Sequence, residues 1–238
     1  MKNIISLKWL NALTLFIAIT STSISAQNDN DLEGWSAVEL NLKATKKLSF
    51  SVAEHLRFRN DISTVKNYFT QIKVNYEILK NLELGAGVRY ITKNDDVGGQ
   101  QGYDPFFRYQ FDAAYRHKIE KVDLFFRLRY QNKNQLGRSE SEGDIAKEFI
   151  RSRFGVGYKI KPLKLTLRLF AEHFNQPNNS KIEQSETRMR YTLKLNRRFK
   201  KIGSFTLFYG IQNNSVGDLK TKKSFLGLKY AYKIDFTK

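Results

Sequence analysis

Residues 122–131 read VDLFFRLRYQ, a stretch in which large apolar side chains alternate with charged or polar ones. Successive side chains of an extended chain point to opposite faces, so Leu124 and Leu128 share one face while Arg127 and Arg129 share the other. This period of two predicts a β-strand with one apolar and one charged face. The length also matches the roughly 9 to 11 residues that a tilted strand needs to cross a bilayer.

The same period recurs along the chain from Trp35 onward. There are eleven such runs, whose first large apolar residues are Val38, Leu48, Tyr68, Leu82, Phe107, Val122, Phe154, Leu163, Met189, Phe205 and Leu226. They predict an all-β fold, an antiparallel up-and-down transmembrane β-barrel of about 10–12 strands. Because single-chain bacterial barrels usually have an even number of strands, we expect ten or twelve. Residues 27–34 would supply a further strand or cross the lumen, or one run is divided wrongly.

The connections between the runs alternate in length. Short ones follow the odd-numbered runs, at residues 45–47, 79–81, 118–121, 161–162 and 197–203. Longer polar ones follow the even-numbered runs, at residues 60–66, 93–104, 132–146, 175–184 and 213–220. Short periplasmic turns and longer extracellular loops are typical of outer-membrane barrels.

The N-terminus has the composition of an export signal. Lys2 and Lys8 precede or begin a mostly apolar run, and small residues ending at Ala26 follow it. This order predicts a cleaved secretory signal peptide over residues 1–26 rather than an anchor helix, and the run is too short to span a membrane. We therefore expect a short polar segment at 27–34, a single barrel domain at 35–238, and a location in the outer membrane of a Gram-negative bacterium.

The chain is strongly basic and contains no cysteine. Its formal charge is +18 and its pI about 9.9, which by themselves suggest a nucleic-acid partner. Export argues against nucleic acid and favours outer-membrane lipids and the phosphates of lipopolysaccharide. The absence of cysteine excludes disulfides and thiolate metal sites, and the sequence shows no metal-ligand spacing or cofactor motif. We expect no metal and no cofactor.

Arginines dominate the polar faces of the runs. We expect ten of them to point into the lumen as contacts for an anion or an acidic ligand: Arg57, Arg89, Arg108, Arg127, Arg129, Arg151, Arg153, Arg168, Arg188 and Arg190. Carboxylates on neighbouring strands can pair with them, since adjacent strands lie about 4.8 Å apart. One interpretation is a narrow lumen filled with satisfied charges, and the other is an anion-preferring pore or an acidic-ligand pocket.

A second candidate site is a rim formed by Glu54, His55, Glu172 and His173. Ala53-Glu54-His55-Leu56 and Ala171-Glu172-His173-Phe174 both end runs that precede long connections. Glu54 lies on the apolar face of its run, so a β-bulge there would be needed to turn it inward. The sequence contains no Gly-x-Ser-x-Gly motif, and Ser49 and Ser51 are too far along their strand to reach His55. We predict no catalytic residues.

The last run resembles the recognition signal of the barrel-assembly machinery. It places Gly227 before the spaced aromatic residues Tyr230 and Tyr232, with Phe236 near the end. Phe225 stands where that signal has a polar residue, and the chain ends beyond its last aromatic residue. The resemblance implies the assembly machinery as a partner.

The chain from about residue 34 also resembles a family of Gram-negative outer-membrane proteins known as domain of unknown function number 2490. Trp35, the Glu54-x-x-Arg57 pair, the strand from Leu82 to Tyr90 and Arg127-x-Arg129-Tyr130 carry the resemblance. It implies a barrel in the outer membrane and implies no activity.

Three hypotheses follow. The first is a barrel with a basic lumen that acts as a structural or binding protein, or as a narrow, porin-like pore preferring anions. The second is an outer-membrane enzyme acting on lipid or lipopolysaccharide. The third is a soluble periplasmic lipocalin-like barrel with an apolar interior.

Overall fold

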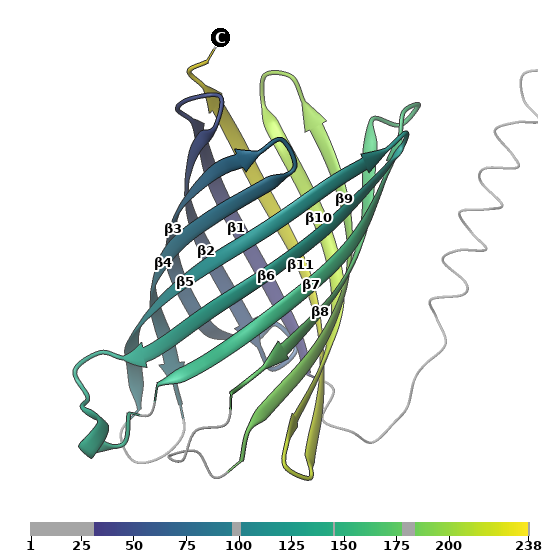
Figure 1. Cartoon of the computed structure of the whole chain (residues 1–238). Helices are drawn as coiled ribbons and strands as arrows, with labels where there is room; N and C mark the ends of the chain where they lie inside the picture. The colour runs from purple at the N-terminus through teal and green to yellow at the C-terminus, as the bar shows by residue number, and fades with distance from the viewer. Residues whose placement is uncertain (1–30, 97–100, 145, 178–183, 238) are drawn as a thin grey trace, which may run out of the picture.

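The computed structural model describes residues 31–96, 101–144, 146–177 and 184–237, and these form a closed β-barrel (Figure 1). The signal peptide expected at 1–26 lies outside the described residues. The strand β1 begins at Asp31, so the last four residues of the expected polar segment belong to the barrel. Within the described residues the one helical element is the 3-10 turn η1, and no helix is long and apolar enough to cross a membrane.

The barrel contains eleven strands in the described part of the chain. Their bounds, with η1 in its place, are β1 Asp31–Lys43, β2 Leu48–Arg59, β3 Thr64–Leu79, β4 Leu82–Asp95, β5 Gly102–Ile119, β6 Val122–Gln135, η1 Glu140–Glu142, β7 Lys147–Ile160, β8 Leu165–Asn175, β9 Glu186–Phe199, β10 Gly203–Val216 and β11 Leu219–Asp235. Each of the eleven runs seen in the sequence is one strand.

The expectation of an even strand count is therefore wrong. Consecutive strands pair antiparallel, and β1 closes the barrel by pairing with β11 in parallel, with Asp31 opposite Lys223 and Lys43 opposite Asp235. In an up-and-down barrel with an odd number of strands, the first and last run in the same direction. Their pairing can only be parallel, and no turn is needed because the chain does not connect them directly.

The register keeps the two faces of the sheet distinct. Leu128 lies opposite Ala113 and Ser152 and is 46% exposed, whereas its neighbour Arg129 is 4% exposed. An outward apolar belt surrounds the barrel and includes Val38, Leu40, Phe50, Val52, Ile72, Leu84, Val88, Phe111, Phe126, Leu128, Phe154, Val156, Leu169, Leu193, Leu207, Leu226 and Leu228. The arginines lie inside. This arrangement is the opposite of a lipocalin-like barrel, whose interior is apolar.

The two ends of the barrel differ in their connections (Figure 1). The short-turn end carries residues 44–47, 80–81, 120–121, 161–164 and 200–202, together with the end of β11. The long-loop end carries the connections that follow β2, β4, β6, β8 and β10. Four of the five are shorter than expected, because the strands continue into polar residues that the apolar alternation does not reveal. The connections after β2 and β10, residues 60–63 and 217–218, are as short as the turns at the other end.

Candidate functional site

A layer of ion pairs crosses the middle of the barrel. The carboxylate of Glu172 accepts hydrogen bonds from Arg127 at 2.7 Å, Arg151 at 2.8 Å and Arg153 at 2.5 Å. Asp112 accepts two from Arg129, at 2.5 and 2.8 Å, and pairs with Lys73 at 3.5 Å. We call these seven residues the carboxylate layer: Lys73, Asp112, Arg127, Arg129, Arg151, Arg153 and Glu172.

The strand register explains how the carboxylate layer forms. Arg153 lies opposite both Arg127 and Glu172, and Asp112 lies opposite Arg129. Like charges on neighbouring strands repel, so Arg127 and Arg153 need an anion between them. Glu172 supplies it and is 1% exposed. The layer is thus filled by paired charges, as the first interpretation of the lumen expects, although its five cations outnumber its two carboxylates.

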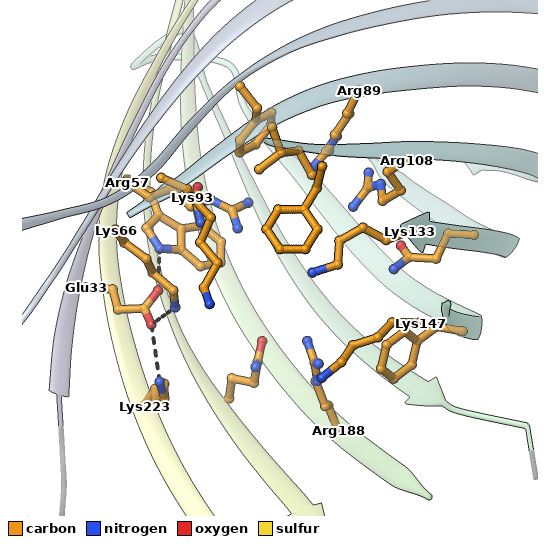
Figure 2. A pocket seen from close by; sticks show the side chains of 18 of the residues that line it. Glu33, Arg57, Lys66, Arg89, Lys93, Arg108, Lys133, Lys147, Arg188 and Lys223 are labelled. Atoms are coloured by element: carbon orange, nitrogen blue, oxygen red, sulfur yellow. Dashed lines mark hydrogen bonds and ion pairs between the residues drawn. The ribbon is translucent and has the colours of Figure 1, made fainter. Parts of the chain in front are cut away.

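Above this layer, toward the long-loop end, lies a cavity of about 350 Å³ that we call the cationic cup (Figure 2). Its wall contains two carboxylates, Glu33 and Glu186. It contains ten cationic side chains: Arg57, Lys66, Arg89, Lys93, Arg108, Lys133, Lys147, Arg188, Arg190 and Lys223. Figure 2 shows Lys93, Lys133 and Lys147 reaching into the cup from three different strands.

Few of the cations in the cup are neutralised. Glu33 pairs with Lys66 and with Lys223, and Glu186 pairs with Arg188 through two hydrogen bonds. Within the described residues, the other seven cations of the cup form no ion pair with a carboxylate. The cup therefore carries a large excess of positive charge, which raises the local concentration of anions.

Aromatic rings support several of these cations. The guanidinium of Arg57 lies 4.0 Å from the centre of the Trp35 ring, and that of Arg89 lies 4.5 Å from Phe69. The ammonium of Lys133 lies 4.1 Å from Phe106. A ring stabilises a cation through its face without accepting its N–H groups. Arg89 donates one of these groups to the amide oxygen of Gln71 at 2.5 Å, and no carboxylate of the described residues takes the others.

Glycines on the inner face leave room for this aromatic wall. Trp35 stacks on Phe225 with ring centres 4.0 Å apart, and Phe208 packs against both rings. A Cβ atom at Gly227 would overlap the ring of Phe208, and one at Gly210 would overlap the ring of Phe225. Large rings can lie flat inside the barrel only where the neighbouring strand has no side chain.

The predicted basic lumen residues divide among three levels of the barrel. The cup holds Arg57, Arg89, Arg108, Arg188 and Arg190, and the carboxylate layer holds Arg127, Arg129, Arg151 and Arg153. Arg168 lines a cavity of about 590 Å³ at the short-turn end, beside another of about 720 Å³. Neither cavity shares a lining residue with the cup.

The sequence analysis missed the lysines and aromatic residues of the cup. Lys93, Lys133 and Lys147 lie at strand ends, beyond the apolar alternation that marked the runs. Phe69, Phe106, Phe149 and Phe225 occupy inward positions that the analysis expected to be polar. The strict period of two could have identified both groups, because each residue keeps the parity of the inward arginine or lysine on its own strand, such as Lys73 for Phe69 and Lys229 for Phe225.

The four residues of the predicted rim site do not come together. Glu54 points outward, and the irregularity of β2 lies between Arg57 and Phe58 rather than at Glu54. His173 also points outward and is exposed, while Glu172 belongs to the carboxylate layer. His55 points inward and stacks on Phe69 at 4.4 Å. No group of three His, Asp or Glu side chains suited to a metal ion occurs in the described parts of the chain.

The residues of the predicted assembly signal lie on β11 and just beyond it. Gly227 faces the interior opposite Trp35 of β1, in the pair of strands that closes the barrel. Tyr230 donates a hydrogen bond from its hydroxyl to the Ile202 carbonyl at 2.6 Å, and Tyr232 and Phe236 are exposed. The structure thus places the aromatic residues of the signal near the short-turn end.

The sequence profile of the family described as "Protein of unknown function (DUF2490)" matches residues 32–221. The chain belongs to the DUF2490 family. The resemblance seen in the sequence is thereby confirmed, and the match spans β1 to the start of β11 of this DUF2490 barrel. Among curated proteins, none matches the chain.

Solved structures with a similar fold include three of the outer-membrane protein OccK1, also called OpdK, from Pseudomonas aeruginosa, one of them with vanillate. Each is 10% identical and covers 75% of this chain, with TM-scores of 0.32, 0.32 and 0.31. This DUF2490 chain covers 54%, 53% and 56% of theirs, about half their length. We draw no functional conclusion from them.

Proposed function

We propose that this protein is an outer-membrane barrel that binds an acidic solute in the cationic cup and is closed below it by the carboxylate layer. The observation that carries the proposal is the set of seven cations around a 350 Å³ cavity that pair with no carboxylate among the described residues. Burying so many like charges together costs free energy, and an anionic ligand would recover it.

Location in the outer membrane is supported by the outward apolar belt. Large side chains such as Phe111 (57% exposed) and Phe154 (53% exposed) face away from the barrel on every side, where water would be unfavourable and acyl chains favourable. The export signal expected in the sequence agrees with this location. Long loops usually face the cell exterior, so the cup would open toward the outside.

Binding is favoured over free conduction by the packing of the lumen. Glu172 and Gln110 are each 1% exposed, and Arg129 and Arg151 are almost as deeply buried. These residues separate the cup from the cavities at the short-turn end. A solute entering the cup would meet paired guanidiniums rather than open water.

The wall of the cup indicates the chemistry of the ligand. Arg57 and Arg89 present planar guanidiniums backed by rings, a geometry suited to bidentate contacts with phosphate or carboxylate oxygens. Lys133 and Lys147 add ammonium groups at the mouth. A cavity of this size accommodates a ligand of about the size of a sugar phosphate, since small-molecule pockets measure roughly 300 to 1,000 Å³.

Tryptophan fluorescence tests this proposal. Trp9 lies within the expected signal peptide, so Trp35 is the sole tryptophan of a protein beginning at residue 27 and reports on the cup directly. In detergent-refolded barrel, we expect glucose 6-phosphate to change the emission of Trp35 saturably and glucose to leave it unchanged.

The matched variants are Arg57→Gln in the cup and Arg168→Gln at the other end. Arg57→Gln should weaken binding of glucose 6-phosphate at least tenfold, because a hydrogen bond to a charged group contributes about 1.5 to 3 kcal/mol. Arg168→Gln should bind as the parent protein does. Equal responses to glucose and its phosphate, or no loss in Arg57→Gln, would contradict the proposal.

Planar-bilayer recording separates the closed barrel from the narrow anion pore. We expect the parent protein to insert without steady conductance steps in 1 M KCl. Stable conductance steps with anion selectivity would show that the carboxylate layer opens. The protein would then be an anion pore, and the proposal of a closed, ligand-binding barrel would be wrong.

A further inference from the structure

The connections at the two ends of the barrel carry opposite charge. The five connections of the short-turn end contain eight lysines, Lys46, Lys47, Lys80, Lys121, Lys161, Lys164, Lys200 and Lys201, and one carboxylate, Glu120. The described residues of the five connections at the long-loop end include one cation, Arg138, and six carboxylates, Asp61, Asp96, Glu140, Glu142, Asp144 and Asp218. We call the eight lysines the basic rim.

Exposed apolar side chains accompany the basic rim. Leu79 is 63% exposed beside Lys80, Leu163 is 58% exposed beside Lys164, and Ile202 is 59% exposed beside Lys201. Ile119, two residues before Lys121, is 52% exposed. Four of the five turns thus carry an apolar side chain next to or two residues from a lysine, a combination typical of chains that lie at a bilayer interface.

The placement of the rim distinguishes a lipid surface from a protein partner. Because the barrel is closed, its five turns are distributed around the whole circumference at one end (Figure 1). A globular protein would contact one side of such a ring. A lipid leaflet surrounds the barrel and meets every turn at the same depth.

We propose that the basic rim binds the phosphate groups of anionic phospholipids in the leaflet at the short-turn end. The lysine ammoniums pair with the phosphates, and Leu79, Leu163 and Ile202 rest at the boundary with the acyl chains. The inference rests on the proposed membrane location, not on ligand binding in the cup. The acidic connections at the other end give the barrel a preferred orientation toward this leaflet.

Spin-labelled lipids test the proposal. The barrel is reconstituted in phosphatidylcholine vesicles, and electron paramagnetic resonance measures the association of labelled phosphatidylglycerol relative to labelled phosphatidylcholine. The test variant is Lys80→Gln with Lys164→Gln. The matched control is Lys220→Gln with Lys222→Gln, two exposed lysines near the long-loop end.

We expect the parent protein to prefer phosphatidylglycerol at low salt. The rim variant should lose up to about thirtyfold of that preference, the change that corresponds to ~2 kcal/mol for two lysines at ~1 kcal/mol each near an anionic surface. The control should keep the preference, and 1 M NaCl should abolish it because the Debye length then falls to about 3 Å.

Four results would overturn the inference. If the barrel inserts but shows no preference for phosphatidylglycerol, the inference about the basic rim is wrong, whereas the membrane location stands. An equal loss in the rim variant and the control assigns the effect to overall charge. If the rim variant keeps the lipid preference but loses binding to polyglutamate, the basic rim binds an acidic protein. A barrel that remains soluble without detergent and does not insert overturns the membrane location itself.

Discussion

The carboxylate layer and the cationic cup use the same residue type in opposite ways. In the layer, Arg151 and Arg153 share the oxygens of Glu172. In the cup, toward the long-loop end, Arg57 lies against the face of Trp35 and pairs with no carboxylate in the described residues. Both kinds of arginine can lie on a ring, since Arg151 is also 4.1 Å from the centre of Phe174, so the difference between the two levels is the carboxylate. Arginine is held in an ion pair where a carboxylate meets it and is available for a ligand where none does.

The largest expected effect comes from removing the central carboxylate of the carboxylate layer. Glu172→Gln leaves three buried guanidiniums without their anion, and we expect the free energy of unfolding to fall by about 3 to 5 kcal/mol. Urea unfolding in vesicles, followed by Trp35 fluorescence, measures it. Glu186→Gln removes a carboxylate of the cup whose side chain is 15% exposed, against 1% for Glu172, and should cost about 1 kcal/mol or less. Equal losses would erase the distinction between the two levels.

The next effect concerns the aromatic wall. Gly227→Ala places a Cβ in the ring of Phe208 and 2.5 Å from the carbonyl oxygen of Trp35, and the backbone cannot move aside freely. We expect a loss of about 1 to 3 kcal/mol, typical of overpacking, and a shifted emission of Trp35. Gly102→Ala meets no atom within 4 Å and should leave both unchanged. A neutral Gly227→Ala would show that the wall is loosely packed.

A smaller effect of opposite sign is expected at the mouth of the cup. Lys147 lies directly opposite Lys133, so Lys147→Gln removes a like-charge pair. The unliganded barrel should gain roughly 0.2 to 1 kcal/mol at low salt, and the gain should shrink in 0.5 M NaCl. Lys222→Gln, opposite Asn213, serves as the control and should change little. Destabilisation by Lys147→Gln would mean that the cup is already neutralised.

The smallest effect lies in the loop that contains η1, where a serine holds a carboxylate. The backbone N–H and the hydroxyl of Ser139 each donate to Glu142 at 2.7 Å and lower the pKa of its carboxyl below its ordinary value of 4.5. Ser139→Ala should raise that pKa part of the way back, as measured by carbon NMR titration, while Ser141→Ala should not.

The sign of this pH dependence follows from the lowered pKa. The hydrogen bonds to Glu142 stabilise the folded loop at neutral pH, and that contribution is lost as the pH falls below 4.5 and through the folded-state pKa. A loop that opened as the pH rose would contradict this account.

The period of two was sufficient for much of the fold. A strand has two faces whatever its neighbours are, so residues such as Leu128 and Arg129 had to point to opposite sides of any sheet. The sequence was therefore enough to predict the face of the sheet to which each side chain points, the barrel fold and the positions of the eleven strands. The paired interior was also expected, since strands rich in arginine need carboxylates nearby.

The tertiary structure decided which strands close the barrel and which side chains form ion pairs. The number of strands in the closed barrel, ten, eleven or twelve, depended on the pairing of β1 with β11. These two segments lie nearly two hundred residues apart in the chain. The register likewise chose which arginines meet Glu172, because Arg127 and Glu172 are 45 residues apart in the chain. A local pattern fixes which way a side chain points, but long-range pairing alone fixes what it points at.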